Sequence, residues 1–354
     1  MFIVLVICIF ADGFFHALKE GIELAGAFEI VMSERKALVE KIVGMMKQGD
    51  FFHNASEWDR DALRPQNPLS RVWYRGGNRM KLMAVVTERG YRDPRWATAK
   101  QLFDKGYHIK AGEHGTICEK WIFEKEKKTK DEHGNTVRKV VQLDRPQVMF
   151  FRVFNGEQVE NFPEYVPTAQ DEDKTQLGQM IDQIISTSEC PVVEAAQDRA
   201  YYSPSQDRIV LPLRSMFKDE ESFAKTAIHE MGHSTGHPDR LNRPLGGMFG
   251  SEEYAKEELR AEIGALFTEA DLGISLKGEH YEDHSDYLRS WIGVLQNDYN
   301  EFFRACADAE QIAKRLIGNY TKKYALKMEV DAVPDLNKIE SCDQAIPVED
   351  AKIL

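Results

Sequence analysis

The sequence predicts an α+β protein of two domains: an N-terminal domain of mixed helices and strands, and a C-terminal domain that is mostly helical with a small sheet. Three observations support this fold class. The chain has 354 residues, of which 42% are hydrophobic, enough for two cores. An acidic, proline-punctuated stretch at residues 161–173 divides it. Residues 121–147 are patterned as a β-hairpin, whereas apolar residues recur at helical spacing through much of the second half.

Changes in composition along the chain set the expected domain boundaries. A run of nine apolar residues from Phe2 to Phe10 precedes a new helix start at Met32. The run is shorter than the ~20 residues of a membrane-spanning helix and lacks the basic residues of a secretory signal. We therefore read it as a non-native or disordered extension, with a short membrane-attached segment as the alternative. The expected segments are an extension at 1–31, an N-terminal domain at 32–165, a linker at 166–176, a C-terminal domain at 177–327 and an acidic, disordered tail at 328–354.

A hairpin is predicted at residues 200–212, where a Ser-Pro-Ser-Gln-Asp turn precedes a short strand at 208–211 that a proline ends. We place this strand at a sheet edge, where an extended peptide could pair with it through main-chain hydrogen bonds. A purely structural strand is the alternative reading.

Helices are predicted on both sides of residue 250. Residues 219–234 carry acids in the first turn and apolar residues at helical spacing, and Gly236 lies just beyond their end. A second helix begins at the N-cap Ser251 and ends at Gly273. Further helical patterns extend over residues 285–323.

The first of these helices contains His229-Glu230-Met231-Gly232-His233, an H-E-x-x-H pattern. Two histidines four residues apart lie on the same helical face, where their imidazoles can hold one zinc ion at ~2.0–2.1 Å. Glu230 lies on the neighbouring side of the turn and can accept a proton from an attacking water. The pattern therefore predicts metal-assisted hydrolysis, with Glu230 as the catalytic base.

A catalytic zinc site needs a third protein ligand, and the sequence offers two candidates. We favour Glu258 on the second helix, with Glu262 one turn later orienting a ligand histidine through its free ring nitrogen. Asp239 is the alternative. It lies ten residues after His229, which is the place of the third zinc ligand in the pattern H-E-x-x-H-x-x-G-x-x-H. His237 follows too closely to share the helical face, and we assign it a catalytic role in the loop, polarising the substrate.

Basic side chains concentrate in residues 71–110. This stretch has ten basic and three acidic side chains, an excess of seven positive charges inside a chain of net charge −12. Such a polarity predicts a site for a polyanion. The aromatic residues Trp73, Tyr74, Tyr91, Trp96 and Tyr107 are interleaved with the charges, and stacking of a base on an aromatic ring is worth ~1–3 kcal/mol whatever the sequence. We therefore expect single-stranded nucleic acid here, because the bases of a duplex are already stacked.

From Tyr202 to Gly273 the chain resembles the zincin domain of ArdC-type antirestriction proteins, which occur on plasmids, phages and other mobile elements. The residues that carry the resemblance are Asp207, Ile209, Pro212, Phe217, His229-Glu230, His233, Thr235-Gly236-His237, Arg240-Leu241-Asn242-Arg243, Tyr254-Ala255, Glu257-Glu258-Leu259, Ala261-Glu262 and Leu272-Gly273. The resemblance implies a zincin-like metallopeptidase domain with one zinc ion per chain, held by His229, His233 and a glutamate of the second helix.

The first half is similar to the DNA-binding domain of the same family. The matching residues are Tyr74-Arg75-Gly76, Asn78, Asp93 to Gln101, Gly106, Ile109-Lys110, Gly112-Glu113, Gly115, Val153-Phe154-Asn155, Gln158 and Pro163. This similarity implies binding of single-stranded DNA. The nucleic-acid-binding residues that we expect are Trp73, Tyr74, Arg75, Asn78, Arg79, Arg95, Trp96, Lys100 and Lys110.

The resemblance implies that the protein protects incoming single-stranded DNA from host restriction and that its peptidase acts on a restriction enzyme or another host protein. A non-catalytic DNA-binding protector with a structural or vestigial zinc is the alternative. An enzyme acting on the nucleic acid itself is the third class, although nucleases usually favour carboxylate-rich magnesium sites. Five widely spaced cysteines argue against a disulfide framework and predict a cytoplasmic protein, and we expect no membrane partner.

Overall fold

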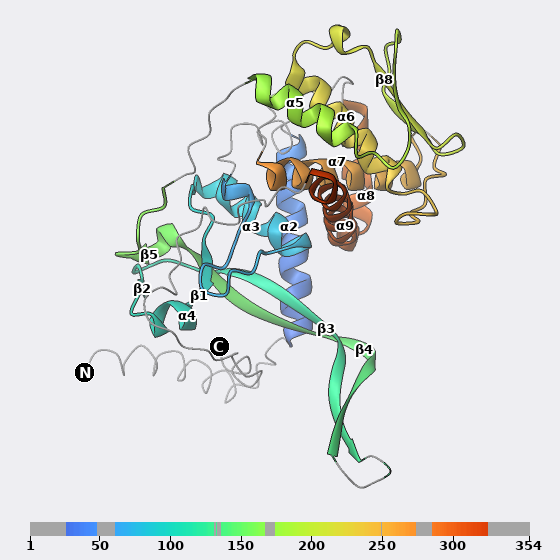
Figure 1. Ribbon diagram of the computed structural model, residues 1–354. Coiled ribbons are helices and arrows are strands. Elements are labelled where there is room, and N and C mark those ends of the chain that lie inside the picture. The colour runs from blue at the N-terminus through green and yellow to red at the C-terminus, as the bar shows by residue number, and fades with distance from the viewer. Residues whose placement is uncertain are drawn as a thin grey trace, which may run out of the picture. The chain divides into compact units, whose positions relative to one another are not determined.

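The computed structural model describes residues 26–47, 61–130, 132, 136–166, 174–248, 250–273 and 285–324 (Figure 1). The predicted extension up to residue 25, the linker residues 167–173 and the acidic tail lie outside these ranges. The mixed α+β class is confirmed. None of the described helices combines the length and the apolar character needed to cross a membrane. The described chain falls into two compact units.

The first unit contains the beginning of helix α2 (Ala27–Lys47) and most of a long hairpin, strands β3 (Thr116–Lys130) and β4 (Thr136–Asn155). The predicted hairpin is therefore confirmed. Arg35 of α2 forms an ion pair with Glu119 of β3, and its guanidinium lies 5.2 Å from the ring centroid of Trp121. The helix begins at Ala27, one turn before the expected start at Met32.

The second unit contains all other described residues. Its N-terminal elements are α3 (Gly76–Arg89), β1 (Trp96–Thr98), α4 (Ala99–Asp104), β2 (His108–Ile109) and β5 (Val159–Glu160). β1 pairs antiparallel with the end of β4, with Ala97 opposite Phe154, and β2 pairs antiparallel with β5. Thr98 begins α4 with a capping box, since its side chain accepts a hydrogen bond from the backbone N–H of Gln101.

The C-terminal elements of this unit are helices with one small mixed sheet. They are α5 (Lys174–Ile185), β6 (Val192–Ala195), β7 (Tyr201–Ser203), β8 (Arg208–Pro212), α6 (Glu220–Ser234), α7 (Glu252–Leu272), α8 (Ser285–Asn297) and α9 (Tyr299–Tyr324).

The placement of residues 208–211 at a sheet edge is wrong. The predicted hairpin forms, because β7 pairs antiparallel with β8 and Tyr202 lies opposite Ile209. However, the strand order is β6-β8-β7, and β6 pairs in parallel with the other side of β8. The backbone of β8 is therefore hydrogen-bonded on both sides, which leaves β6 and β7 as the edges of this sheet.

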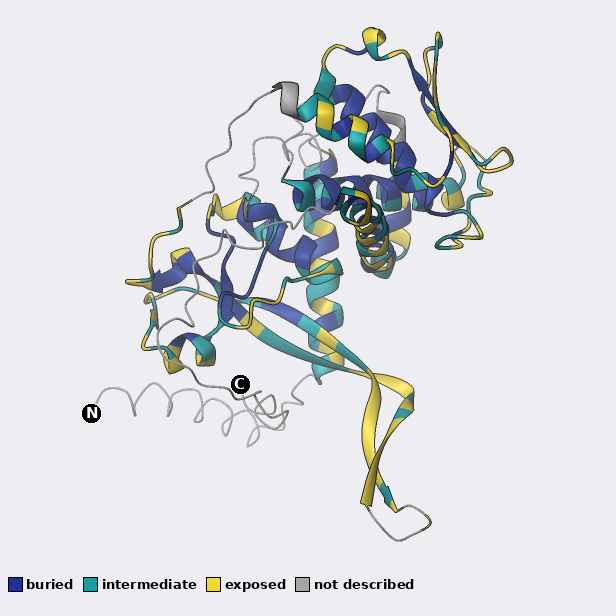
Figure 2. Cartoon of the chain, in the orientation of Figure 1, coloured by how far each residue is buried: buried dark blue, intermediate teal, exposed yellow. Residues whose placement is uncertain are grey.

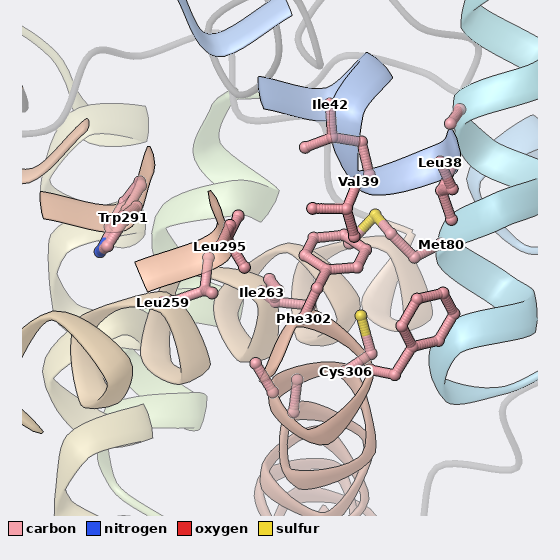
Figure 3. Packing of buried hydrophobic residues seen from close by; sticks show 14 of the residues in the cluster. Leu38, Val39, Ile42, Met80, Leu259, Ile263, Trp291, Leu295, Phe302 and Cys306 are labelled. Carbon is pink, nitrogen blue, oxygen red and sulfur yellow. The ribbon is translucent and has the colours of Figure 1, made fainter. Parts of the chain in front are cut away.

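Helices from both halves of the sequence share the largest hydrophobic core (Figure 3). Leu38, Val39 and Ile42 of α2 pack in one cluster with residues of α3, α7, α8 and α9. Phe302 and Ile263 are fully buried near its centre. A second cluster joins α5, α6 and the mixed sheet to α7 and α9. As Figure 2 shows, α6 and α7 are buried along most of their length. The helix pair that carries the predicted metal ligands is thus held by both cores.

Candidate metal centre

Helix α6 is positioned by its cap and its apolar face. The side chain of its N-cap Asp219 accepts a hydrogen bond of 2.8 Å from the backbone N–H of Ser222, as the acidic start of this helix predicts. The helix ends at Ser234. His229 and His233 therefore occupy the last two turns, where they face α7.

Helix α7 approaches α6 closely because small residues lie between them. A Cβ built on Gly232 would lie 3.6 Å from the carbonyl oxygen of Ala261. Ser251 caps the start of α7, and Gly273, with φ of 69°, caps its end, as expected from the sequence. This close approach brings Glu258 of α7 to the two histidines of α6.

His229, His233 and Glu258 form a cluster of three potential metal ligands. The two Nε2 atoms lie 3.1 Å apart. One carboxylate oxygen of Glu258 lies 3.5 Å from Nε2 of His229, and the other lies 3.4 Å from Nε2 of His233. Tetrahedral donors at ~2.0–2.2 Å from a zinc ion are about 3.3–3.6 Å from one another. The distances from Glu258 lie in this range and the two Nε2 atoms are slightly closer together, so the three side chains form a candidate site for a small metal ion.

A second carboxylate stands behind each histidine. Oε2 of Glu262 lies 3.3 Å from Nδ1 of His229, and Oε1 of Glu257 lies 3.3 Å from Nδ1 of His233. Both imidazoles thus turn Nε2 toward the cluster and Nδ1 toward a carboxylate, the arrangement that orients metal-binding histidines in proteins. At His233 this contact is a hydrogen bond, whereas at His229 it is a close approach without hydrogen-bond geometry. The orienting role expected of Glu262 stays a prediction.

The role of Glu257 was missed at the sequence level. Arg243 donates two hydrogen bonds to its carboxylate, of 3.0 and 2.6 Å, and further ones to Thr235 Oγ1 and the carbonyl oxygen of Gly232. Arg243 therefore ties Glu257 to the last turn of the metal helix. This contact forms because the loop with Arg243 folds back onto α7. The spacing of residues in the sequence does not predict it.

The charges of the cluster shift the pKa values of its members strongly. Burial alone would lower the pKa of His233, but the charge of Glu258 and the hydrogen bond with Glu257 outweigh it and raise the pKa to about 9. Burial is likewise outweighed at His229, where Glu258 and Glu262 raise the pKa well above its usual value. The pKa of Glu258 shifts the other way. Burial would raise it, but the two histidines outweigh burial and hold it far below its usual range. Each partner thus favours the charged form of the other.

The remaining predicted residues are not among these three potential ligands. Glu230 is 7% exposed, between the two histidines in the sequence. Asp239 lies outside the cluster, because its side chain is 91% exposed and its carboxylate is 3.7 Å from Nδ1 of His237. The loop with His237 is anchored by Arg240, which donates hydrogen bonds of 2.6 Å to both carboxylate oxygens of Asp207.

In the N-terminal half, three of the predicted DNA-binding residues are buried. Arg95 is 1% exposed, forms an ion pair with Asp93 and donates a hydrogen bond to the carbonyl oxygen of Pro163. Trp96 is fully buried. Arg79 is 3% exposed and lies 3.0 Å from Asp271. These side chains hold the fold together in this structure.

The other predicted DNA-binding residues are more accessible. Arg75 has 63% of its side chain exposed and lies 3.9 Å from Glu310. Lys100 is 52% exposed beside Asp104, and Lys110 donates a hydrogen bond of 2.7 Å to a backbone carbonyl. Trp73, Tyr74 and Asn78 are partly exposed. The guanidinium of Arg64 lies 4.4 Å from the ring centroid of Trp73, and the Tyr74 hydroxyl donates to a backbone carbonyl.

The chain matches two protein families along its length. Residues 32–154 match the N-terminal domain of anti-restriction factor ArdC, and residues 179–308 match the zincin-like metallopeptidase family MPTase-PolyVal. The first match covers the basic stretch, and the second covers the cluster of His229, His233 and Glu258.

Similar curated proteins include two Escherichia coli proteins named DNA primase TraC, which are 41% identical over 300 residues and 38% identical over 292 residues. The alignments cover 80% and 78% of this chain, which spans only 27% and 19% of the length of those primases. An uncharacterised protein of Sinorhizobium fredii (strain NBRC 101917 / NGR234), y4eC, is 29% identical over 260 residues, covering 72% of this chain and 82% of that protein.

Two crystal structures of the antirestriction protein ArdC from plasmid R388 are similar to most of this chain. The metal-free structure has a TM-score of 0.63 and the Mn(II)-bound structure one of 0.62, both at 26% sequence identity. Each alignment covers 81% of this chain, and 98% and 97% of the two ArdC chains.

Proposed function

Since this chain is an ArdC-type protein that joins an ArdC N-terminal domain to a zincin-like metallopeptidase domain, we propose that it protects the single-stranded DNA of a mobile genetic element from host restriction. It does so in the cytoplasm by binding the DNA through its N-terminal half and cleaving a host protein at its metal centre. The observation that carries the proposal is the cluster of His229, His233 and Glu258.

His229, His233 and Glu258 would hold the metal, which we propose is one zinc ion per chain. Two imidazoles and one carboxylate are the donor set of many catalytic zinc sites, and a fourth position is left for water or substrate. A bound zinc supplies Lewis acidity, which lowers the pKa of water toward ~7 and polarises a carbonyl group. The Mn(II)-bound ArdC structure supports a divalent cation at this kind of site and makes manganese the competing assignment.

The remaining steps belong to residues of the chain. Glu257 and Glu262 fix the ring orientation of the two histidines and hold a proton on each Nδ1, so that Nε2 faces the cluster. Glu230, one residue after His229, accepts the proton of the attacking water and returns it to the leaving amine. His237, in the anchored loop after α6, hydrogen-bonds the substrate and polarises its carbonyl group.

The N-terminal half supplies the grip on DNA. Its accessible cations Arg75, Lys100 and Lys110 contact phosphates, and the partly exposed rings of Trp73 and Tyr74 offer stacking platforms for unpaired bases. Phosphate contacts make such binding weaken as the salt concentration rises. The similarity to proteins named DNA primase supports a role on nucleic acid.

The test compares Glu230→Gln with Glu221→Gln, the same change in the first turn of the same helix. Loss of the general base should lower peptidase activity by a factor of about 10²–10⁴. Metal content, measured by elemental analysis, and single-strand affinity, measured by fluorescence anisotropy, should stay at the wild-type level in both variants. The control should keep full activity.

The outcomes separate the competing functions. Full peptidase activity in Glu230→Gln would refute the role of this residue as base. If the variant still protects DNA from restriction in cells as well as the wild type does, the protein is a non-catalytic protector and its metal is structural. If metal analysis returns no stoichiometric divalent ion for the wild type, the metallopeptidase assignment fails.

A further inference from the structure

The hairpin of β3 and β4 is unusually exposed for a pair of strands. Along β3, every described residue from Phe123 to Lys130 is exposed except Thr129, and in β4 residues 136–140 are all exposed (Figure 2). Phe123, Val137 and Val140 are 58%, 40% and 55% exposed. A two-stranded ribbon without a covered face is only marginally stable by itself, so this surface is suited to a partner.

The two faces of the ribbon can be told apart by residue number, because successive side chains of a strand point to opposite faces. Gln142 donates a hydrogen bond of 3.0 Å to Glu124, and Arg138 forms an ion pair of 3.3 Å with Glu126. Even-numbered residues of the two strands therefore share one face, and odd-numbered residues share the other.

Charges are segregated between these faces. Within residues 120–130 and 136–145, the odd-numbered face has four cations and no acid, and it also has aromatic and aliphatic side chains. Its members are Trp121, Phe123, Lys125, Lys127, Thr129, Val137, Lys139, Val141, Leu143 and Arg145. The even-numbered face has four cations too, but it contains all three acids of these ranges, Glu124, Glu126 and Asp144.

The cations of the odd-numbered face are available to a ligand. Among the described residues, Lys125, Lys127, Lys139 and Arg145 form no ion pair, and three of these cations belong to exposed residues in the outer half of the hairpin. Four such charges without an acid, on a chain of net charge −12, are a local anion-binding surface.

We infer that the odd-numbered face of the ribbon binds duplex DNA. The major groove of a duplex admits a two-stranded β-ribbon, with cations reaching phosphates and aliphatic side chains contacting thymine methyl groups. Single-stranded DNA would need accessible rings for stacking. Here Phe123 is the one exposed ring among the described residues of this face, since Trp121 is partly covered and packs on Arg35. The protein would then bind duplex DNA in addition to the proposed single strand.

The experiment compares two triple variants with the same change of charge on opposite faces. Lys125→Gln/Lys127→Gln/Lys139→Gln removes three cations from the odd-numbered face, and Lys120→Gln/Lys128→Gln/Lys130→Gln removes three from the even-numbered face. Binding of a blunt DNA duplex and of the corresponding single strand is measured by fluorescence anisotropy over a series of salt concentrations, with the full chain.

The odd-face variant should bind duplex at least about tenfold more weakly, and its slope of log affinity against log salt should be smaller by about 2–3, because three phosphate contacts are lost. Its single-strand affinity should not change, and the even-face variant should resemble the wild type with both ligands. No duplex binding by the wild type, or equal weakening by both variants, would overturn the inference. A parallel loss of single-strand binding would do the same and assign the ribbon to the proposed single-strand site. The proposed peptidase function is not touched by any of these results.

Discussion

At the scale of single residues, protons and a metal ion compete for the same imidazoles. The surrounding glutamates raise the pKa of His233 to about 9 and that of His229 well above its usual value, so this histidine pair holds protons near neutral pH before a metal binds. A ligand imidazole must be neutral, so binding expels these protons.

We therefore expect the apparent metal affinity to rise with pH through the neutral range and up to about 9, the pKa of His233. Near neutral pH, each metal ion bound should displace protons from the histidine pair, and their number is the quantity to be measured. Titration calorimetry in buffers of different ionisation enthalpy measures this number. A metal affinity that does not change across the neutral range would contradict the proton-bound state of the two histidines.

The buried side chain of Glu269 predicts that the free energy of unfolding also depends on pH. Its Oε1 is buried without a hydrogen-bond partner among the described residues. Burial raises its pKa to about 8. The charge of Glu262 adds to this shift, whereas Lys225 and His229 oppose it. The unfolded chain releases this proton near 4.5, so between 4.5 and about 8 the free energy of unfolding falls as pH rises.

The variant Glu269→Gln should abolish that fall, which is on the order of a few kcal/mol across the window. Its free energy of unfolding should exceed that of the wild type near pH 8, and the difference should shrink toward pH 4.5. Urea denaturation at both pH values measures this, with Glu253→Gln, an exposed position of the same helix, as the control. An identical pH dependence of variant and wild type would show that Glu269 is already ionised in the folded protein.

At the scale of secondary-structure elements, the site depends on how the loop before α7 meets its first turn. A Cβ on Gly247 would lie 2.4 Å from the backbone nitrogen of Tyr254, and backbone atoms cannot yield as a side chain can. Gly246, next to it, has nothing within 4 Å of its Cβ position. The loop is therefore packed against α7 at one glycine and open at the other.

Gly247→Ala should lower the free energy of unfolding by about 1–3 kcal/mol, the usual cost of overpacking. It should also weaken metal binding, because the displaced turn leads into Glu257 and Glu258. Gly246→Ala should leave both quantities unchanged. Thermal denaturation and metal titration of the two variants check this, and equal behaviour of the pair would show that the contact at Gly247 is unimportant.

Most of the elements around the site could be predicted from local signals. The caps Asp219, Ser251 and Gly273 lie where their side chains or backbone satisfy the ends of α6 and α7. The strand β6 could not be predicted, and with it the position of β8. Each residue of β6 pairs in parallel with a residue of β8 that lies 17 positions later in the chain, and periodicity within a segment contains no information on such pairing.

At the scale of the whole molecule, the largest hydrophobic core belongs to both halves of the sequence. Leu38 and Ile42 of α2 and Met80 of α3 pack with Phe267 of α7 and Phe302 of α9 in one cluster. Removing either set of helices would expose this apolar surface to water. The helices of the second unit should therefore unfold together.

Differential scanning calorimetry of the full chain should show one main transition for these helices, and addition of zinc should move the whole transition to higher temperature. Fluorescence of tryptophans in both halves should report the same midpoint. Two separate transitions, of which the metal shifts only one, would contradict a shared core and support independent domains.

The sequence by itself determined the helices α6 and α7, their caps, the H-E-x-x-H pair and the glutamates of α7, because helical spacing and capping are properties of a few neighbouring residues. Only the tertiary structure decided which carboxylate reaches the histidines, that Glu257 and Arg243 support His233, and that Arg95 and Trp96 are buried. These outcomes depend on how closely α6 and α7 pack and on where distant strands pair. The physical reason is that a contact between segments far apart in the chain is selected by the packing of the whole core, which no local pattern specifies.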